Sequence, residues 1–69
     1  MTVAKVIEIF SSSPESIEDA VNRGIERVEK TLDEVKGVWI KNIKCDVENG
    51  KVSRWRVDMK VTFVLKDTA

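Results

Sequence analysis

The stretch Trp55–Leu65, Trp-Arg-Val-Asp-Met-Lys-Val-Thr-Phe-Val-Leu, alternates between apolar and polar side chains. All six odd-numbered positions are apolar, and the even-numbered positions from Arg56 to Thr62 are polar. A helix would distribute these apolar side chains around its whole surface, whereas a strand places them on one face. The pattern therefore predicts a long strand with one apolar face, which the rest of the chain must cover, and one charged face.

The length of the chain limits how stable it can be alone. Its 69 residues fit a single domain, residues 1–69. A domain of this size buries only about 60% of the surface that its unfolded chain exposes. Cys45 is the only cysteine and there is no histidine, so an internal disulfide is excluded and no zinc site is expected. We therefore expect oligomerisation to supply the missing stability.

The charge balance argues against two classes of partner. Twelve basic and twelve acidic residues give a net charge of zero, so no overall field attracts nucleic acid or an anionic membrane. The first residues lack the pattern of a signal peptide, and no apolar run approaches the roughly 20 residues that span a bilayer. We expect a soluble cytoplasmic protein with neither nucleic acid nor membrane as a partner.

A strand followed by one long helix is predicted before residue 38. Residues 3–10 are rich in β-forming side chains. The helix is expected to begin near Pro14, either with Ser13 as the N-cap or with Ser12 and Glu15 as a capping box. Gly37 is then expected as the C′ residue that ends it. The apolar stripe of this helix recurs at spacings of three and four, at Ile17, Ala20, Val21, Ile25, Val28, Leu32 and Val35.

Gly24 interrupts the predicted helix. A glycine inside a helix costs about 1 kcal/mol relative to alanine. We therefore expect another segment of backbone to approach the helix closely at this position.

The dipeptide Asn49-Gly50 predicts a type I′ turn between residues 38–48 and the strand that contains Trp55–Leu65. If Glu48 pairs with Lys51, the register of the hairpin follows. On the apolar face this register pairs Val38 with Val61, Ile40 with Met59, and Asn42 with Val57. On the other face it pairs Trp39 with Lys60, Lys41 with Asp58, Ile43 with Arg56, Cys45 with Arg54, and Val47 with Val52.

These elements predict an α+β fold of order β-α-β-β. The sheet has three antiparallel strands in the order 1-3-2 and wraps around one long helix. Its second face has no helix to cover it, although the predicted register places Trp39, Ile43, Cys45, Val47 and Val52 there among charged side chains. An exposed patch of this kind indicates a subunit interface or a binding groove, and one surface can serve both purposes.

Several segments together resemble the dodecin family. They are Ser-Ser-Pro-Glu-Ser-Ile-Glu-Asp-Ala-Val at residues 12–21, Lys-Thr-Leu at residues 30–32, Asn-Gly-Lys-Val at residues 49–52, and Trp55–Leu65. The resemblance extends without gaps over nearly the whole chain. It implies a hollow homododecamer in which a three-stranded sheet cups each helix. It also implies non-enzymatic binding of flavin (FMN, riboflavin or FAD) for storage or sequestration.

The resemblance also indicates where a flavin would bind. Flavin-binding dodecins generally carry a stacking tryptophan at the position of Gly37 and a glutamine that hydrogen-bonds the ring edge at the position of Arg56. In this chain Trp39 lies two residues after Gly37 and points to the same face, about 7 Å along the strand. Gly37, Trp39 and Arg56 are therefore the candidate flavin-binding residues.

Trp39 and Arg56 allow two interpretations. In the first, Trp39 stacks on an aromatic ligand and Arg56 donates hydrogen bonds to ring carbonyls or to phosphate. In the second, Trp39 fills a subunit contact and Arg56 pairs with a carboxylate, in a dodecin-like shell that binds no flavin or takes another ligand such as an ion or coenzyme A. No dense carboxylate cluster predicts a metal site. We predict no catalytic residues, because Cys45 has no histidine to activate it and no acid–base pair is evident.

Overall fold

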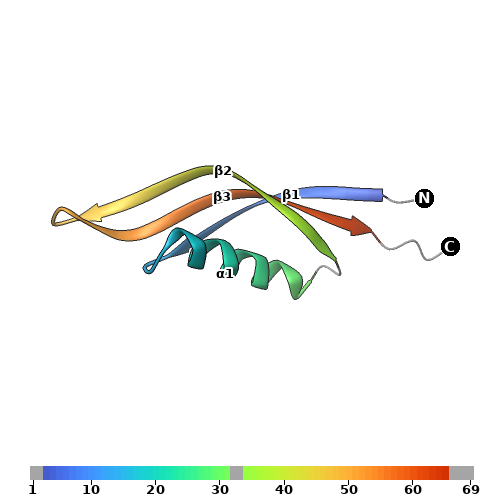
Figure 1. The fold of residues 1–69 in the computed structure, drawn as a ribbon, viewed down its shortest axis with the longest axis horizontal. Coiled ribbons are helices and arrows are strands. Elements are labelled where there is room, and N and C mark those ends of the chain that lie inside the picture. The colour runs from blue at the N-terminus through green and yellow to red at the C-terminus, as the bar shows by residue number, and fades with distance from the viewer. Residues whose placement is uncertain (1–2, 32–33, 66–69) are drawn as a thin grey trace.

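The computed structural model describes residues 3–31 and 34–65. The elements follow the predicted order, with strand β1 (Val3–Ser13), helix α1 (Ile17–Glu29), strand β2 (Val35–Glu48) and strand β3 (Lys51–Leu65). The strands form one antiparallel sheet in the order β1-β3-β2, and α1 lies along one side of it (Figure 1). The predicted fold class and strand order are therefore confirmed.

The core lies between α1 and the alternating face of β3. Val57, Met59, Val61 and Phe63 are each at most 5% exposed, and from the helix Ala20 is fully buried. The intervening side chains of β3 point to the opposite side of the sheet, as the period of two requires. We call the surface away from α1 the open face. Partly buried side chains that pack against the core complete it: Ile9, Ile17, Val21 and Val38.

The helix begins later than the sequence predicts. Ser13 is the last residue of β1, because Ser11, Ser12 and Ser13 continue the pairing with β3. Its buried hydroxyl accepts a hydrogen bond from the Glu15 N–H at 3.0 Å and donates one to the Asp19 carboxylate. Ser16 is the N-cap, and its hydroxyl accepts from the Asp19 N–H at 2.9 Å. The predicted Ser13 cap and the predicted capping box are both wrong, because pairing with β3 holds these serines in a strand.

The helix also ends earlier than predicted. Its C-cap is Lys30, and β2 already begins at Val35, which pairs with Phe63. Gly37 lies within β2 opposite Thr62 and does not have a positive φ, so it does not cap the helix. Leu32, which the stripe included, lies outside the described residues. The helix ends earlier because the segment before residue 38 pairs with β3, which holds this segment in a strand.

Gly24 is buried against the sheet, as a close approach requires. A Cβ atom at this position would lie 2.5 Å from Cε of Met59 and 3.2 Å from Cβ of Ser11. The sheet approaches the helix closely here, but the three nearest atoms belong to side chains, so the predicted approach of another backbone is not observed. Because glycine has no side chain, α1 can pack directly against Met59.

The predicted hairpin register holds next to the turn and again over residues 38–40, and it fails between these two segments. The turn has the positive φ angles of type I′, 52° at Asn49 and 73° at Gly50. Next to it Val47 pairs with Val52, and closer to the start of β2 Trp39 pairs with Lys60, as predicted. Between these points the register is shifted by one residue, because Ser53 in β3 and Lys41 in β2 are extra residues at bulges. The pairs of the shifted segment are Asp46–Arg54, Cys45–Trp55, Lys44–Arg56, Ile43–Val57 and Asn42–Asp58.

This shift changes which side chains of β2 lie on the open face. The predicted pairs Asn42–Val57, Lys41–Asp58, Ile43–Arg56 and Cys45–Arg54 are wrong. Directly paired residues share a face, so Asn42 and Lys44 lie on the open face, while Ile43 and Cys45 lie on the face of Val57. Ile43 stays 49% exposed there, because α1 lies mainly over β1 and β3 and only slightly over β2.

Candidate functional site

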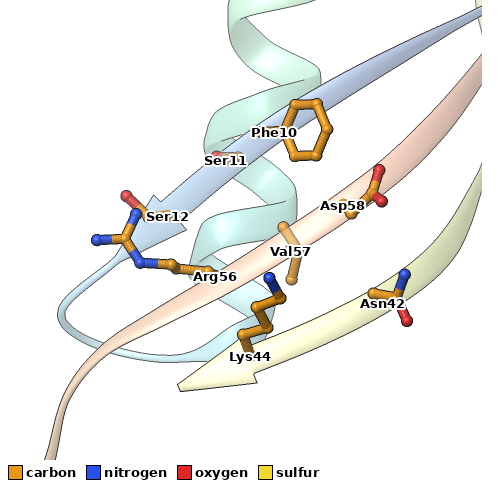
Figure 2. A pocket seen from close by; sticks show the side chains of 8 residues that line it. All are labelled: Phe10, Ser11, Ser12, Asn42, Lys44, Arg56, Val57 and Asp58. Carbon is orange, nitrogen blue, oxygen red and sulfur yellow. The ribbon is translucent and has the colours of Figure 1, made fainter. Parts of the chain in front are cut away.

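A groove of about 270 Å³ lies on the open face of the sheet. It is formed by two neighbouring levels of the sheet. At one level Asp58 of β3 pairs with Phe10 of β1 and Asn42 of β2, and at the next Arg56 pairs with Ser12 and Lys44. Figure 2 shows these side chains in front of the strands, with α1 behind them. The residues that line the groove are Phe10, Ser11, Ser12, Asn42, Lys44, Arg56, Val57 and Asp58.

Arg56 is held in place by a carboxylate on β2. Its Nε donates hydrogen bonds to Asp46 Oδ2 at 2.9 Å and to Oδ1 at 3.1 Å, and its Nη2 lies 2.8 Å from Oδ2. This hydrogen-bonded pairing lowers the pKa of Asp46 and raises the pKa of Arg56. Asp46 thus uses one edge of the guanidinium, and the planar group keeps further N–H donors for other acceptors.

The neighbouring cations have different partners. Arg54 donates from Nη1 to the hydroxyl of Ser12 at 3.1 Å. Lys41, at the bulge, reaches across β3 to Glu8 of β1, where its Nζ lies 3.4 Å from Oε2. Lys41 therefore ties the two outer strands together, and it does not pair with Asp58 as the sequence predicted.

Asp58 also lines the groove. Its Oδ1 is shielded from solvent and receives no hydrogen bond within the part of the chain that the structure describes. A buried polar atom usually has a partner, so this oxygen requires an explanation.

The aromatic side chains of the open face are unusually exposed. Phe10 is 77% exposed at one side of the groove. Trp39 is 65% exposed on β2, and the Lys60 ammonium lies 5.7 Å from the centre of its ring. At Gly37, two residues earlier, an added Cβ would meet no atom within 4 Å. Flat apolar surfaces beside polar groups suit a planar ligand or a subunit contact.

The three candidate residues from the sequence are only partly brought together. Arg56 lines the groove, whereas Trp39 and Gly37 lie farther along β2, opposite Lys60 and Thr62. Phe10, Asn42 and Lys44 line the groove but were not among the candidates. Phe10 was missed because its neighbours depend on how β1 pairs with β3, and the other two because of the bulge at Lys41.

Two further classes of site have no support in the described geometry. Across residues 3–31 and 34–65, no three side chains of the metal-binding types His, Cys, Asp and Glu come together. Among the same residues, no helix has the length and apolar character needed to cross a membrane.

Comparison with known proteins gives a consistent family and fold. The family model described as Dodecin matches residues 3–66. The structure is similar to the dodecin from Streptomyces davaonensis, with a TM-score of 0.89 and 29% identity over 96% of this chain and 97% of that one. A mutant of the Thermus thermophilus dodecin gives a TM-score of 0.92 and 28% identity over 99% of this chain and 100% of its own.

A calcium-chelating dodecin is also among the similar structures. This protein from Mycobacterium tuberculosis, described with a novel calcium-binding site, has a TM-score of 0.79 and 26% identity over 97% of this chain and 96% of its own. No curated protein matches the chain.

Proposed function

Because this chain belongs to the dodecin family, whose model matches residues 3–66, we propose that it binds flavin without catalysing a reaction and stores or sequesters it. Flavin binding is known for the family, and its members are small binding proteins. A bound flavin brings a flat ring system with an apolar edge and an edge of N–H and carbonyl groups. FMN, riboflavin and FAD share that ring.

The groove of the open face is the observation that carries this proposal. Phe10 offers an exposed aromatic surface, Arg56 keeps N–H donors beyond those that Asp46 uses, and Asp58 adds a carboxylate to the lining. The aromatic surface can stack on the flat flavin ring, and the N–H donors can bond to its carbonyl oxygens. Trp39 and Gly37 would hold the ring from the next part of β2, where Gly37 leaves space beside the exposed indole.

Flavin binding is tested by titration. Purified protein is expected to quench the fluorescence of added FMN or riboflavin at micromolar concentration, because stacking on an aromatic side chain opens a path for quenching. The visible absorption spectrum of protein purified without added cofactor shows whether flavin is retained. An unchanged fluorescence up to a large excess of protein would refute flavin storage.

A homododecamer is the proposed state of assembly. Large apolar side chains remain exposed on the isolated chain, among them Phe10, Val47 and Trp39 at 77%, 63% and 65%. A small chain that leaves so much apolar surface uncovered gains stability by burying it against copies of itself. A monomer in sedimentation at low micromolar concentration would contradict this part of the proposal. A cytoplasmic location remains a prediction from the sequence.

One observation favours an alternative in which the shell binds no flavin, or takes another ligand such as an ion or coenzyme A. The Lys60 ammonium already lies over the ring of Trp39, so the indole does not present both of its faces freely. If Trp39 serves only a subunit contact, Trp39→Ala lowers the thermal stability of the assembly and leaves ligand uptake unchanged. Loss of flavin quenching at unchanged thermal stability would reject this alternative.

A further inference from the structure

The turn between β2 and β3 places a side-chain amide next to an unhindered backbone nitrogen. Asn49 and Gly50 are both exposed, and both have the positive φ of a type I′ turn. Strand pairing resumes between Glu48 and Lys51, so Gly50 lies outside the ladder. Among the backbone hydrogen bonds that the described residues make outside helices and strands, none involves the Gly50 N–H. This nitrogen is therefore available to react with its neighbour.

We propose that Asn49 is a modification site, at which the side chain loses ammonia without an enzyme and becomes aspartate or isoaspartate. Asparagine is among the chemically labile residues of proteins. The Gly50 nitrogen gives up its proton and attacks Cγ of Asn49, and a cyclic succinimide forms as the bond from Cγ to the amide nitrogen breaks. The amide nitrogen takes up the proton and leaves as ammonia. Water then opens the ring at either carbonyl group, which gives aspartate or isoaspartate.

The other two asparagines have neighbours that oppose this reaction. Asn22 lies within α1, where the N–H of the next residue, Arg23, is held in a helical hydrogen bond. Asn42 lies within β2 and precedes Ile43, whose branched side chain crowds its own nitrogen. Gly50 has no Cβ to obstruct the attack. All three asparagines are exposed, so access to water does not distinguish them.

Both products change the hairpin. Each adds an acid beside Glu48 to a chain in which twelve basic and twelve acidic residues balance. Isoaspartate also routes the main chain through the former side chain, which inserts a methylene group into the turn. A two-residue type I′ turn cannot take up this extra length and keep its register. Isoaspartate is therefore expected to loosen the pairing next to the turn, where Val47 pairs with Val52.

The reaction is followed by incubating purified wild-type protein in mildly alkaline buffer. Trypsin then releases residues 45–51, in which Asn49 is the only asparagine, and residues 6–23, which contain Asn22. Mass spectrometry measures deamidation in both peptides, and an isoaspartate-specific methyltransferase labels isoaspartate. Asn49 is expected to convert at least about ten-fold faster than Asn22, because attack at Asn22 must first break a helical hydrogen bond. Asn49→Gly, whose Gly-Gly pair suits the same turn, should show no conversion in residues 45–51.

The effect on the hairpin is tested with the separated products. Ion exchange isolates the chains that carry the new charge, and the methyltransferase identifies the isoaspartate fraction. The matched control is Asn49→Asp, which has the same charge and an ordinary main chain, because Asp-Gly also suits a type I′ turn. The isoaspartate form is expected to unfold at a lower urea concentration than Asn49→Asp.

Three results would each contradict the inference. If Asn49 stays intact in folded protein while it converts in protein unfolded by urea, the turn prevents the attack. If Asn22 converts as fast as Asn49, the turn is not the selected site. If the isoaspartate form is as stable as Asn49→Asp, the predicted loss of register is wrong. None of these measurements uses a ligand, so the inference does not depend on the proposed flavin function.

Discussion

Met59 and Asp58 are neighbours in β3, yet one lies under the helix and the other in the open groove. Met59 is fully buried, touches the helix at Gly24, and belongs to the core cluster with Ala20 and Val57. No donor among the described residues bonds to the shielded Oδ1 of Asp58, and its partner across the strands, Phe10, is 77% exposed. The core residues of β3 have their contacts within the chain, whereas exposed apolar surface remains on the open face.

This difference separates the residues that fold the chain from those that are free for function. Substitutions on the covered face should lower the free energy of unfolding by removing packing. Substitutions on the open face should change stability less and affect binding or assembly more. Neighbouring positions of the same strand suit the comparison, because they share a backbone environment and lie on opposite faces.

The largest effect is expected from Met59→Ala. Removing a fully buried methionine side chain should lower the free energy of unfolding by about 2–5 kcal/mol, because it loses apolar contact and leaves a cavity. The matched control is Lys60→Ala on the open face, where loss of the contact with Trp39 should cost about 0.5–1 kcal/mol. Urea denaturation at one protein concentration measures both, since assembly makes stability depend on concentration. Equal losses of unfolding free energy in the two variants would contradict the distinction between the faces.

Gly24→Ala gives the next largest effect. The new Cβ would lie 2.5 Å from Met59 Cε, and overpacking of this kind costs about 1–3 kcal/mol. Higher helix propensity returns about 1 kcal/mol, so the net expectation is a modest loss of stability. Gly37→Ala is the matched control, since nothing lies within 4 Å of that Cβ, and it should not destabilise the chain. A Gly24→Ala variant more stable than wild type in urea would show that Met59 yields without cost.

The covered face was largely predictable from the sequence, because its determinants are local. The alternation of Trp55–Leu65 reports directly which side chains point to the helix, and Asn49-Gly50 specifies the turn. The ends of the helix were not predictable in the same way. Serine at position 13 suits an N-cap and also suits the end of a strand, and only pairing with β3 decides between them. Pairing with β3, which is distant in sequence, outweighed the local propensity of Ser13 to cap a helix.

Most of the groove could not be predicted from the sequence, for a related reason. It depends on the bulges at Lys41 and Ser53, and neither residue type marks a bulge. A turn sets register only as far as the first bulge, so Asn42 was assigned to the wrong face. Phe10 joins the groove through the register of β1 against β3, which no turn fixes. Arg56 was found because resemblance to a family singled out its position.

The smallest expected effect concerns the pair that positions Arg56 on the open face. The Arg56 hydrogen bonds lower the pKa of Asp46 from its ordinary value of 3.8. A carboxyl whose pKa is lower in the folded state stabilises the fold above its ordinary pKa, and this contribution disappears as pH falls through the lowered value. Wild type should therefore be slightly more stable than Asp46→Asn at pH 7, and the two should converge at a pH well below 3.8. High salt should also reduce the difference at pH 7, because the pair is exposed. Urea denaturation across this pH range provides the measurement, with Glu48→Gln as the control for loss of a carboxylate elsewhere on β2. A difference that grows on acidification would have the wrong sign for this pair, and Arg56 would then owe its orientation to the rest of the groove.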